Sequence, residues 1–454
     1  MHATPSIRAK LTILAGGGLL LWPALYNGWP LVFSDTGAFL FAALEYWPQW
    51  DKPIAYALFL HALSWRLTYW AAAFAQGLIV SHLVWLMLRV CTAASPLRHL
   101  LLVAGLALLT PAPWFTAQLM PDFLAPVLVL AVVLLGVFAD RLSRPERAWL
   151  AFLVALSAAS HLSHLGVLAG LLLVLLPVRL LCRLSAWPRR GGVGLLSGAT
   201  GAVAFLVISN ALMWGAPVIS PYGSVFPLAR QLANGPAKDF LRANCPGFLL
   251  CSELGRIGTD SDLILWEQHS PLWAAGDERV MAPEAARILA GTVRAYPREV
   301  ALNALADAAR QLVMVRIGDS LVPDDLGRTV LNNLRKHVPR EVAPFTAARQ
   351  FNGRLAILPV MNALIIATMA AAPVLLALLL WRAADRRLVA ASLLVLLALA
   401  GNAVICGAAS GPHHRYQARI AWLLPLLAGS VLVGRLPEAP LRRAPLAATS
   451  RDRA

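Results

Sequence analysis

Polar and charged side chains that could bind a substrate gather in four separate segments of an otherwise apolar chain. The first segment carries Asp35 and Lys52, and the second carries Asp122. The third contains His161-Leu162-Ser163-His164, and the last contains His413-His414-Arg415-Tyr416. Each segment lies at the end of an apolar stretch, so these side chains can meet in one cleft at the boundary between lipid and water. Such a cleft suits a substrate with a lipid tail and a charged head.

The composition places these residues in a membrane protein. Hydrophobic residues make up 59% of the 454 residues, charged residues make up 14%, and the mean hydropathy is +0.66. A soluble domain is nearer a quarter charged, and disordered, collagen-like and disulfide-stapled secreted chains are excluded as well. The net charge of +16 could indicate nucleic acid, but basic residues also collect in the cytoplasmic loops of membrane proteins. We therefore expect an all-α polytopic membrane protein with no nucleic-acid partner.

Ten apolar stretches predict membrane-spanning helices, each of which needs about 20 mostly apolar residues. The stretch 149–182 is too long for one helix and too apolar to leave the bilayer, so we expect a tight hairpin that breaks at the polar 161–164 step. Seven spans then fall in an N-terminal membrane part (1–213) and three in a C-terminal part (356–434). The expected spans are residues 11–29, 68–88, 99–112, 122–139, 148–161, 164–181, 193–213, 356–381, 388–408 and 418–434.

Lys and Arg in the connecting segments orient these spans, because cytoplasmic loops are rich in both. With the N-terminus inside, the inner segments contain 19 Lys and Arg, whereas the short outer segments contain four. We therefore expect both termini in the cytoplasm, with a basic cytoplasmic tail at 435–454. The first apolar run is long and lacks a small-residue cleavage site before the polar loop, so we expect a retained span.

Two larger segments then lie outside the membrane. In the first (30–67), two apolar stretches are about half as long as a span and carry aromatic residues, which predicts two interfacial helices on the outer leaflet. The second (214–355) has soluble composition, with 16 basic and 14 acidic residues. It predicts a small, mainly helical extracytoplasmic domain. Two of its helices are expected at 283–296 and 297–317, each with Pro at the first position.

Cys245 and Cys251, two of the five cysteines, lie close together in the second outer segment. Outside the cytoplasm, a close pair favours a disulfide bond. Two free thiols are the alternative. A zinc site is disfavoured because no second pair of ligands lies nearby.

Three motifs follow one another in a distinctive order. Asp35 opens the first outer segment, the basic-Pro-x-x-Tyr step Lys52–Tyr56 opens its second apolar stretch, and Arg415-Tyr416 precedes the last, Pro-containing span. This order resembles the GT-C fold glycosyltransferases, integral membrane enzymes that use polyprenyl-phosphate-linked sugars. The resemblance covers roughly 1–213 and 356–434. It implies a GT-C-like fold and the transfer of a sugar from a polyprenyl phosphate to an acceptor hydroxyl.

The chain departs from that family at its first outer loop. Many members carry paired acidic residues there, whereas Asp35 is followed by Thr36 and Gly37. The missing second acid argues against a divalent metal, so we predict no metal site and no certain cofactor, and a divalent metal stays as the open alternative. Without a metal, Arg is suited to stabilise the phosphate that leaves in the reaction, because its planar guanidinium can hold two phosphate oxygens.

The reaction that the resemblance implies also needs a carboxylate that takes the proton of the acceptor. Asp35 is the candidate base; alternatively, it caps the helix that follows it. Asp122 is the second candidate catalytic residue; alternatively, it stabilises the first turn of its helix through the helix dipole.

Arg415 is the candidate phosphate ligand, with Tyr416, His413 and His414 as its neighbours in the substrate site. Alternatively, Arg415 and Tyr416 only anchor the chain at the lipid headgroups, where both residue types sit well. Lys and Arg normally collect in cytoplasmic loops, so a positive charge on an outer loop favours a functional role for Arg415.

The remaining candidates for binding the substrate or its phosphate come from the first and third segments. Lys52 could hold a second phosphate oxygen or simply snorkel to the interface, and Tyr56 belongs to the same motif. His161 and His164 could line the cleft or satisfy exposed groups at helix ends.

We therefore expect a glycosyltransferase of the bacterial inner membrane, acting at its outer face on a polyprenyl-phosphate-linked sugar and an acceptor glycan, lipid or protein. A flippase or transporter of lipid-linked glycans and a non-catalytic protein of envelope assembly are the alternatives. All 23 acidic residues lie in loops or at the ends of spans, which argues against an ion-driven pump. Carboxylates or Arg inside spans would favour transport.

Overall fold

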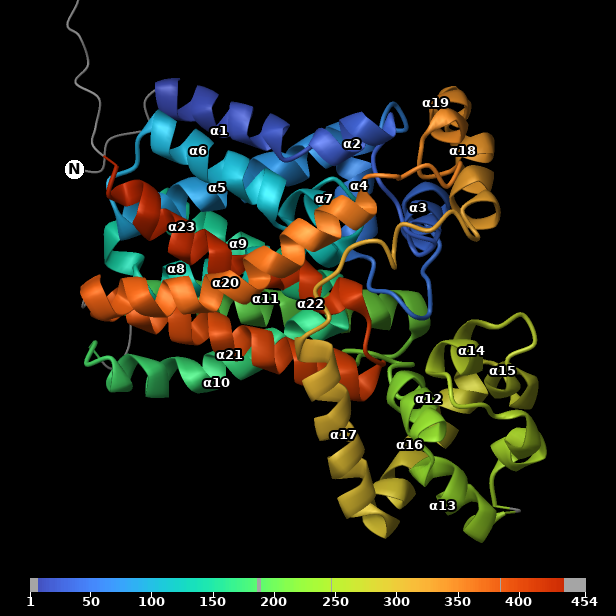
Figure 1. Cartoon of the computed structure of the whole chain (residues 1–454). Coiled ribbons are helices and arrows are strands. Elements are labelled where there is room, and N and C mark those ends of the chain that lie inside the picture. Colours follow the sequence, from blue (N-terminus) through green and yellow to red (C-terminus); the bar gives the residue numbers. More distant parts are fainter. Residues whose placement is uncertain (1–6, 186–188, 246, 384, 437–454) are drawn as a thin grey trace, which may run out of the picture.

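The computed structural model describes residues 7–185, 189–245, 247–383 and 385–436. Throughout these ranges the chain is built from helices, and it contains no β-strand. The prediction of an all-α membrane protein is confirmed for this part of the chain. Figure 1 shows the long helices running side by side in one bundle, with shorter helices gathered at one end.

Six helical segments among the described residues are long and apolar enough to cross a membrane. The other four expected stretches also form helices, but these are shorter, so their crossing of the membrane stays a prediction. The six segments are α5 (Trp70–Cys91), α10 (Leu162–Leu181), α11 (Arg189–Trp214), α20 (Leu358–Ala383), α21 (Arg386–Ala409) and the continuous pair α22 (His414–Ala421) and α23 (Leu423–Gly434). The shorter stretches are α1 (Ile7–Leu19) followed by α2 (Trp22–Asn27), α6 (Pro96–Leu109) followed by α7 (Ala112–Thr116), η1 (Pro121–Phe123) with α8 (Leu124–Val137), and α9 (Arg144–Ser160).

The expected hairpin in the stretch 149–182 is confirmed. Helix α9 begins with a capping box between Ser143 and Glu146, which satisfies free backbone donors of its first turn. It ends at Ser160, and α10 begins at Leu162. His161 lies between them in an extended conformation, and its ring accepts a hydrogen bond from the backbone N–H of Ser163. Helix α8 is apolar on every side and buried along its whole length, so it forms the centre of the bundle.

The two short helices expected in the first outer segment are present as α3 (Thr36–Glu45) and α4 (Ala55–Ser64). Helix α4 packs against α5, and α3 packs against α4 and the short π-helical turn η4 (Gly327–Leu331). Both helices end in residues with positive φ, Tyr46 and Trp65, whose aromatic side chains are exposed. Exposed aromatic side chains are typical of helices at a membrane interface, and the interfacial position of α3 and α4 stays a prediction.

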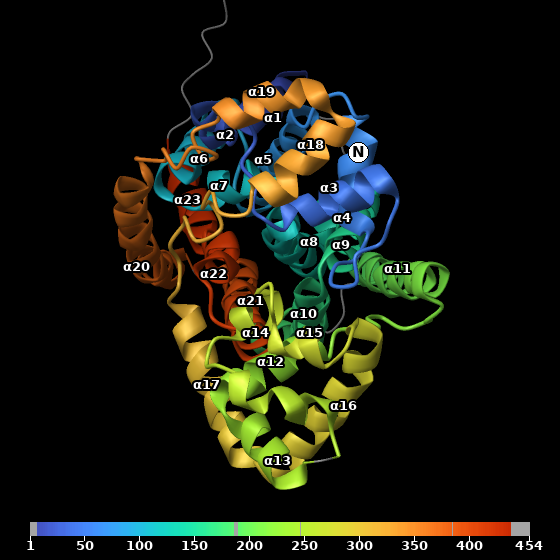
Figure 2. The same cartoon turned by 90° about the vertical axis from the view of Figure 1, so that its right-hand side faces the viewer.

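Residues 214–355, the segment predicted to lie outside the membrane and called the long outer segment below, contribute to two hydrophobic cores. Its first part forms a core of its own with α12 (Val225–Asn234), α13 (Pro236–Asn244), α14 (Ser261–Trp266), α15 (Pro271–Ala275) and α16 (Glu278–Ala295). Its last part, with α18 (Asn332–His337) and α19 (Val342–Ala347), joins the core of the bundle and lies beside α3. Figure 2 looks onto this end and shows the two parts on different sides of it.

Helix α17 (Pro297–Leu312) connects the two parts and packs on α21. The approach is close, because a Cβ at Gly407 would lie 2.8 Å from the backbone oxygen of Asp307. The Asp307 side chain also accepts hydrogen bonds from Arg230 and Asn234 of α12, with 2.8 Å from Arg230 Nε to Oδ2. Asp307 therefore fixes the α12–α16 part against the bundle.

Three details of this segment compare directly with the sequence predictions. The disulfide bond between Cys245 and Cys251 is confirmed. Helix α17 begins at Pro297 as expected, although it ends at Leu312. The expected helix start at Pro283 is wrong: α16 begins at Glu278 and contains Pro283 in its interior. Asp277 accepts hydrogen bonds from two backbone N–H groups of the first turn, and this cap defines the start.

Candidate functional site

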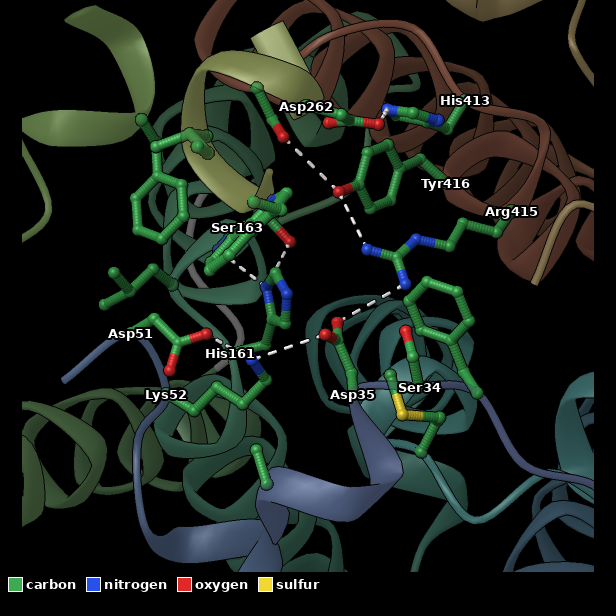
Figure 3. A pocket seen from close by; sticks show the side chains of 18 of the residues that line it. Ser34, Asp35, Asp51, Lys52, His161, Ser163, Asp262, His413, Arg415 and Tyr416 are labelled. Atoms are coloured by element: carbon green, nitrogen blue, oxygen red, sulfur yellow. Dashed lines mark hydrogen bonds and ion pairs between the residues drawn. The ribbon is translucent and has the colours of Figure 1, made fainter. Parts of the chain in front are cut away.

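A cavity of about 830 Å³ lies where the bundle meets the shorter helices. It receives side chains from all four polar segments that the sequence analysis singled out, and also from α12, α14 and η4. Figure 3 shows charged groups of the first segment, of the last segment and of α14 converging on it. The predicted convergence of distant segments on one cleft is therefore found in the structure.

Seven of the ten candidate substrate-site and catalytic residues line this cavity, and three do not. The seven are Asp35, Lys52, Asp122, His161, His413, Arg415 and Tyr416. The three others are Tyr56, His164 and His414, and each has a hydrogen-bond partner elsewhere in the fold.

Tyr56 is fully buried and joins α4 to α5. Its hydroxyl donates to Gln76 Oε1 at 2.7 Å, and Gln76 Nε2 donates to the backbone oxygens of Thr116 and Gln118. His164 Nδ1 lies 3.0 Å from the backbone oxygen of Ser157 in the last turn of α9. This contact satisfies a helix-end group, which is the alternative role that the sequence offered.

His414 also turns away from the cavity. Its Nδ1 accepts a hydrogen bond of 3.1 Å from the backbone N–H of Arg316, in the segment that follows α17. His414 thus connects the last outer loop to the long outer segment, whereas its neighbour His413 faces the cavity.

Asp35 lies between two cations. Its Oδ1 is 3.4 Å from Lys52 Nζ, and its Oδ2 is 3.5 Å from Arg415 Nη1. Asp35 makes no capping hydrogen bond to α3, so the structure does not support the capping alternative. The hydroxyl of Thr36 accepts from the backbone N–H of Phe33 instead, at 3.0 Å, and donates to the backbone oxygen of Leu119. The Asp35 carboxylate is therefore left for the cavity.

These neighbouring charges determine the ionisation states of Asp35 and Lys52. Burial on its own would raise the pKa of Asp35, but the charges of Lys52 and Arg415 outweigh it and hold the pKa below its ordinary value. Burial would lower the pKa of Lys52, and the carboxylates of Asp35 and Asp51 outweigh that effect and raise it. At neutral pH the cavity thus contains one carboxylate whose two oxygens face two cations.

Arg415 is held in a fixed orientation by aromatic rings. Its guanidinium carbon lies 4.3 Å from the ring centre of Phe33 and 4.8 Å from that of Tyr416. Its Nη2 donates to the Tyr416 hydroxyl at 3.0 Å, and its backbone N–H donates to Asp319. Its Nη1, on the side of Asp35, makes no hydrogen bond. A guanidinium held in this way can offer its fork to an anion with little loss of side-chain freedom.

Arg419, which the sequence analysis did not select, does not line the cavity but pairs with Asp122, which does. Its side chain is 0% exposed, and its Nη1 donates to Asp122 Oδ1 at 3.1 Å. Its Nη2 contacts Ser163 Oγ and Asn402 Oδ1, at 3.0 and 3.2 Å. Asp122 therefore lies at the cavity wall as half of a buried ion pair. The spacing of four residues between Arg415 and Arg419 is the signal that was available, because it places both on one face of a helix.

Asp262 of α14 is a second residue that was missed. Its Oδ2 lies 3.3 Å from His413 Nε2, and the backbone of His413 is held by the side-chain amide of Gln311. No pattern in the sequence pointed to Asp262, because the position of the 214–355 segment relative to the bundle could not be predicted.

The residues around Asp35 are poorly suited to a metal ion. Within the described ranges no group of three or more His, Cys, Asp or Glu side chains is arranged to hold one. The two oxygens of Asp35 already face Lys52 and Arg415, so a further cation beside them would be repelled by both.

Replacing Gly37 by Ala is expected to disturb the segment that positions Asp35. A Cβ at Gly37 would lie 2.6 Å from the Cβ of Thr329 and 2.7 Å from its backbone carbonyl carbon, so η4 would have to move. Overpacking of this kind costs about 1–3 kcal/mol, which would lower the midpoint of thermal unfolding in detergent. Gly105→Ala in α6 is the matched control, because a Cβ there meets nothing within 4 Å. Equal midpoints for the two variants would contradict the prediction.

No family model, no curated protein and no solved structure matches this chain.

Proposed function

We propose that this protein is a GT-C-like glycosyltransferase of the bacterial inner membrane. In this proposal it moves a sugar from a polyprenyl-phosphate donor to an acceptor hydroxyl at the outer face. The observation that carries the proposal is the position of Asp35 between Lys52 and Arg415 in one cavity. One carboxylate that can accept a proton and two cations that can bind a phosphate are the groups that this reaction requires.

The geometry supports a specific course for the transfer. The donor phosphate binds Arg415 and Lys52 and balances their charge, so the pKa of Asp35 rises and the carboxylate becomes a better base. Asp35 then takes the proton of the acceptor hydroxyl as the acceptor oxygen bonds to the anomeric carbon. The bond from that carbon to the phosphate oxygen breaks, and the polyprenyl phosphate leaves with the electron pair. The two cations stabilise the negative charge of the departing phosphate.

The remainder of the cavity suits a substrate with a lipid tail. Its wall includes apolar side chains from the ends of two helices that are long enough to cross a membrane, Leu162 of α10 and Ile405 and Ala409 of α21. A polyprenyl chain that follows these helices into the bilayer would leave its phosphate at the charged end of the cavity.

Two observations support the outer face. The disulfide bond between Cys245 and Cys251 belongs to the same part of the chain as Asp262, and such bonds persist in oxidising compartments outside the cytoplasm. The distribution of Lys and Arg over the short connecting segments supports an outer position for the same end of the bundle.

The buried pair of Asp122 and Arg419 favours a second candidate function, a transporter or flippase of lipid-linked glycans. Arg419 lies in the continuous helix His414–Gly434, which is long enough to cross a membrane. Charges kept inside spans are typical of transport pathways. Vesicles that contain the purified protein distinguish the two functions, because a flippase moves the intact glycolipid between leaflets and leaves the sugar on its phosphate.

Arg415→Ala is expected to lower sugar transfer by about 10²–10³-fold, the usual cost of removing one group that stabilises developing negative charge. Arg415→Lys should recover part of the loss, since it keeps the charge but loses the fork. The measurement uses purified protein in lipid nanodiscs, a polyprenyl phosphate carrying a radiolabelled hexose, and a membrane extract from cells lacking the protein as the source of acceptors. The matched control is Arg335→Ala, an exposed Arg of α18 outside the cavity. Transfer at the wild-type rate by Arg415→Ala would overturn the proposed function.

A further inference from the structure

One wall of the cavity is aromatic and comes from the long outer segment. Trp266, the last residue of α14, lines the cavity and is 48% exposed. Asp262 lies one helical turn earlier, also lines the cavity, and has a side chain that is 44% exposed. Residues four apart lie on the same face of a helix. A flat indole ring and a carboxylate therefore face the cavity together.

Trp266 packs against other aromatic rings, of which Trp50 and Phe226 also line the cavity. Trp50, from the loop between α3 and α4, stacks on Trp266 with 5.8 Å between ring centres and on Phe226 at the same distance. Trp273 meets Trp50 edge-on, and its indole N–H donates to the backbone oxygen of Leu265 at 2.7 Å. Trp266 and the rings packed against it, here called the platform, are thus fixed in place, while part of Trp266 stays open to the cavity. A ligand can therefore bind the platform without the cost of ordering its side chains.

The platform lies next to the phosphate-binding cations. Lys52 Nζ is 5.6 Å from the ring centre of Trp266, and it is 3.4 Å from Asp35 Oδ1 on the charged side. A phosphate held by Lys52 would therefore place the group attached to it beside Trp266. In the proposed reaction that group is the sugar to be transferred.

The chemistry of the wall matches a pyranose ring. The C–H groups on the face of a pyranose are apolar and weakly positive, so they pack well on the negative face of an aromatic ring. The hydroxyl groups at its edge donate hydrogen bonds, and a carboxylate is a strong acceptor for them. Burial on its own would raise the pKa of Asp262, but His413 outweighs it and lowers the pKa, which keeps Asp262 ionised.

We propose that Trp266 and Asp262 bind the pyranose ring attached to the lipid phosphate and thereby select the donor sugar. This inference rests on the proposed function, because it takes Lys52 and Arg415 as the phosphate site. It assigns donor selection to the long outer segment, whereas phosphate binding and proton transfer belong to the segments around the bundle.

The test is equilibrium binding to the full-length protein in nanodiscs. The probes are a polyprenyl phosphate without a sugar and the same lipid phosphate carrying glucose, mannose, galactose or N-acetylglucosamine. The wild-type protein should bind at least one glycosylated probe more tightly than the bare one. Trp266→Ala should weaken that probe about tenfold and change the bare lipid phosphate less than twofold, and Trp266→Phe should keep most of the affinity. Asp262→Asn should also weaken only the glycosylated probe.

A control and three outcomes make the test decisive. Trp381→Ala removes a tryptophan that is exposed on α20 outside the cavity, and it should change neither affinity. Equal weakening of both probes by Trp266→Ala would show that the wall binds the polyprenyl chain, and would overturn the inference. A wild-type protein that binds no glycosylated probe better than the bare one would also overturn it. By contrast, failure of Arg415→Ala to weaken the bare lipid phosphate would overturn the proposed function itself.

Discussion

Asp35→Asn is expected to lower sugar transfer by about 10²–10⁴-fold, the range for losing a general base. The amide keeps the shape of the side chain but cannot take the proton of the acceptor. It also removes the charge between Lys52 and Arg415, so these cations should bind the bare lipid phosphate at least as tightly as before. The measurements are the transfer rate and the binding constant for the bare lipid phosphate, in the same nanodisc preparation.

Asp51→Asn is the matched control for this variant. Asp51 also contacts Lys52 and lines the cavity, but it forms no ion pair with Arg415. Its replacement should lower transfer less than tenfold, because Asp35 is retained. A transfer rate near that of the wild-type protein in Asp35→Asn would exclude Asp35 as the base. Loss of binding in Asp35→Asn would show that Asp35 holds the cations in place for the phosphate.

Arg419→Met is expected to destabilise the protein by about 3–5 kcal/mol, because it leaves the buried carboxylate of Asp122 without its partner. It also removes the hydrogen bonds that Arg419 Nη2 donates to Ser163 and Asn402. The loss should appear as a lower midpoint of unfolding when the protein in mild detergent is titrated with a denaturing one.

The double variant Asp122→Leu with Arg419→Met tests whether the destabilisation comes from the unpaired charge of Asp122. Replacing both members of a buried ion pair by apolar side chains is often neutral or stabilising, so the midpoint should recover most of the loss. Recovery of stability without recovery of transfer would place the pair in the chemistry of the cavity. A single variant as stable as the wild-type protein would show that Asp122 is not buried in the way described.

Much of the helical framework could be predicted from the sequence, because a helix that crosses a lipid bilayer needs a long apolar stretch. Long apolar stretches predicted the six spans that the structure supports, and the polar 161–164 step marked the break between α9 and α10. The start of α16 was not predicted, because Pro283 is tolerated inside the helix while Asp277 caps its first turn. The two-part packing of the long outer segment was missed as well. It depends on contacts such as Asp307 with Arg230 and Gly407, which leave no periodic pattern.

The site could be predicted from the sequence where charged residues stand beside long apolar stretches. Asp35, Lys52 and Arg415 stood out as charged residues beside apolar stretches, and all three face the cavity. Tyr56 and His414 occupied suitable positions along the chain, but a position does not determine the direction of a side chain. Asp262 and Trp266 could not be found, since the fold of their segment was needed to bring them to the cavity.

The separation of 380 residues between Asp35 and Arg415 along the chain has a consequence for biogenesis. A nascent polypeptide that has inserted only its first helices already has Asp35 and Lys52, but Arg415, which completes the proposed phosphate site, is synthesised 380 residues after Asp35. In the proposed function, every chain that stops before Arg415 should therefore be inert toward lipid-linked sugars. For the same reason, a protease that removes α22 and α23 should abolish the proposed activity while the rest of the bundle stays in the membrane.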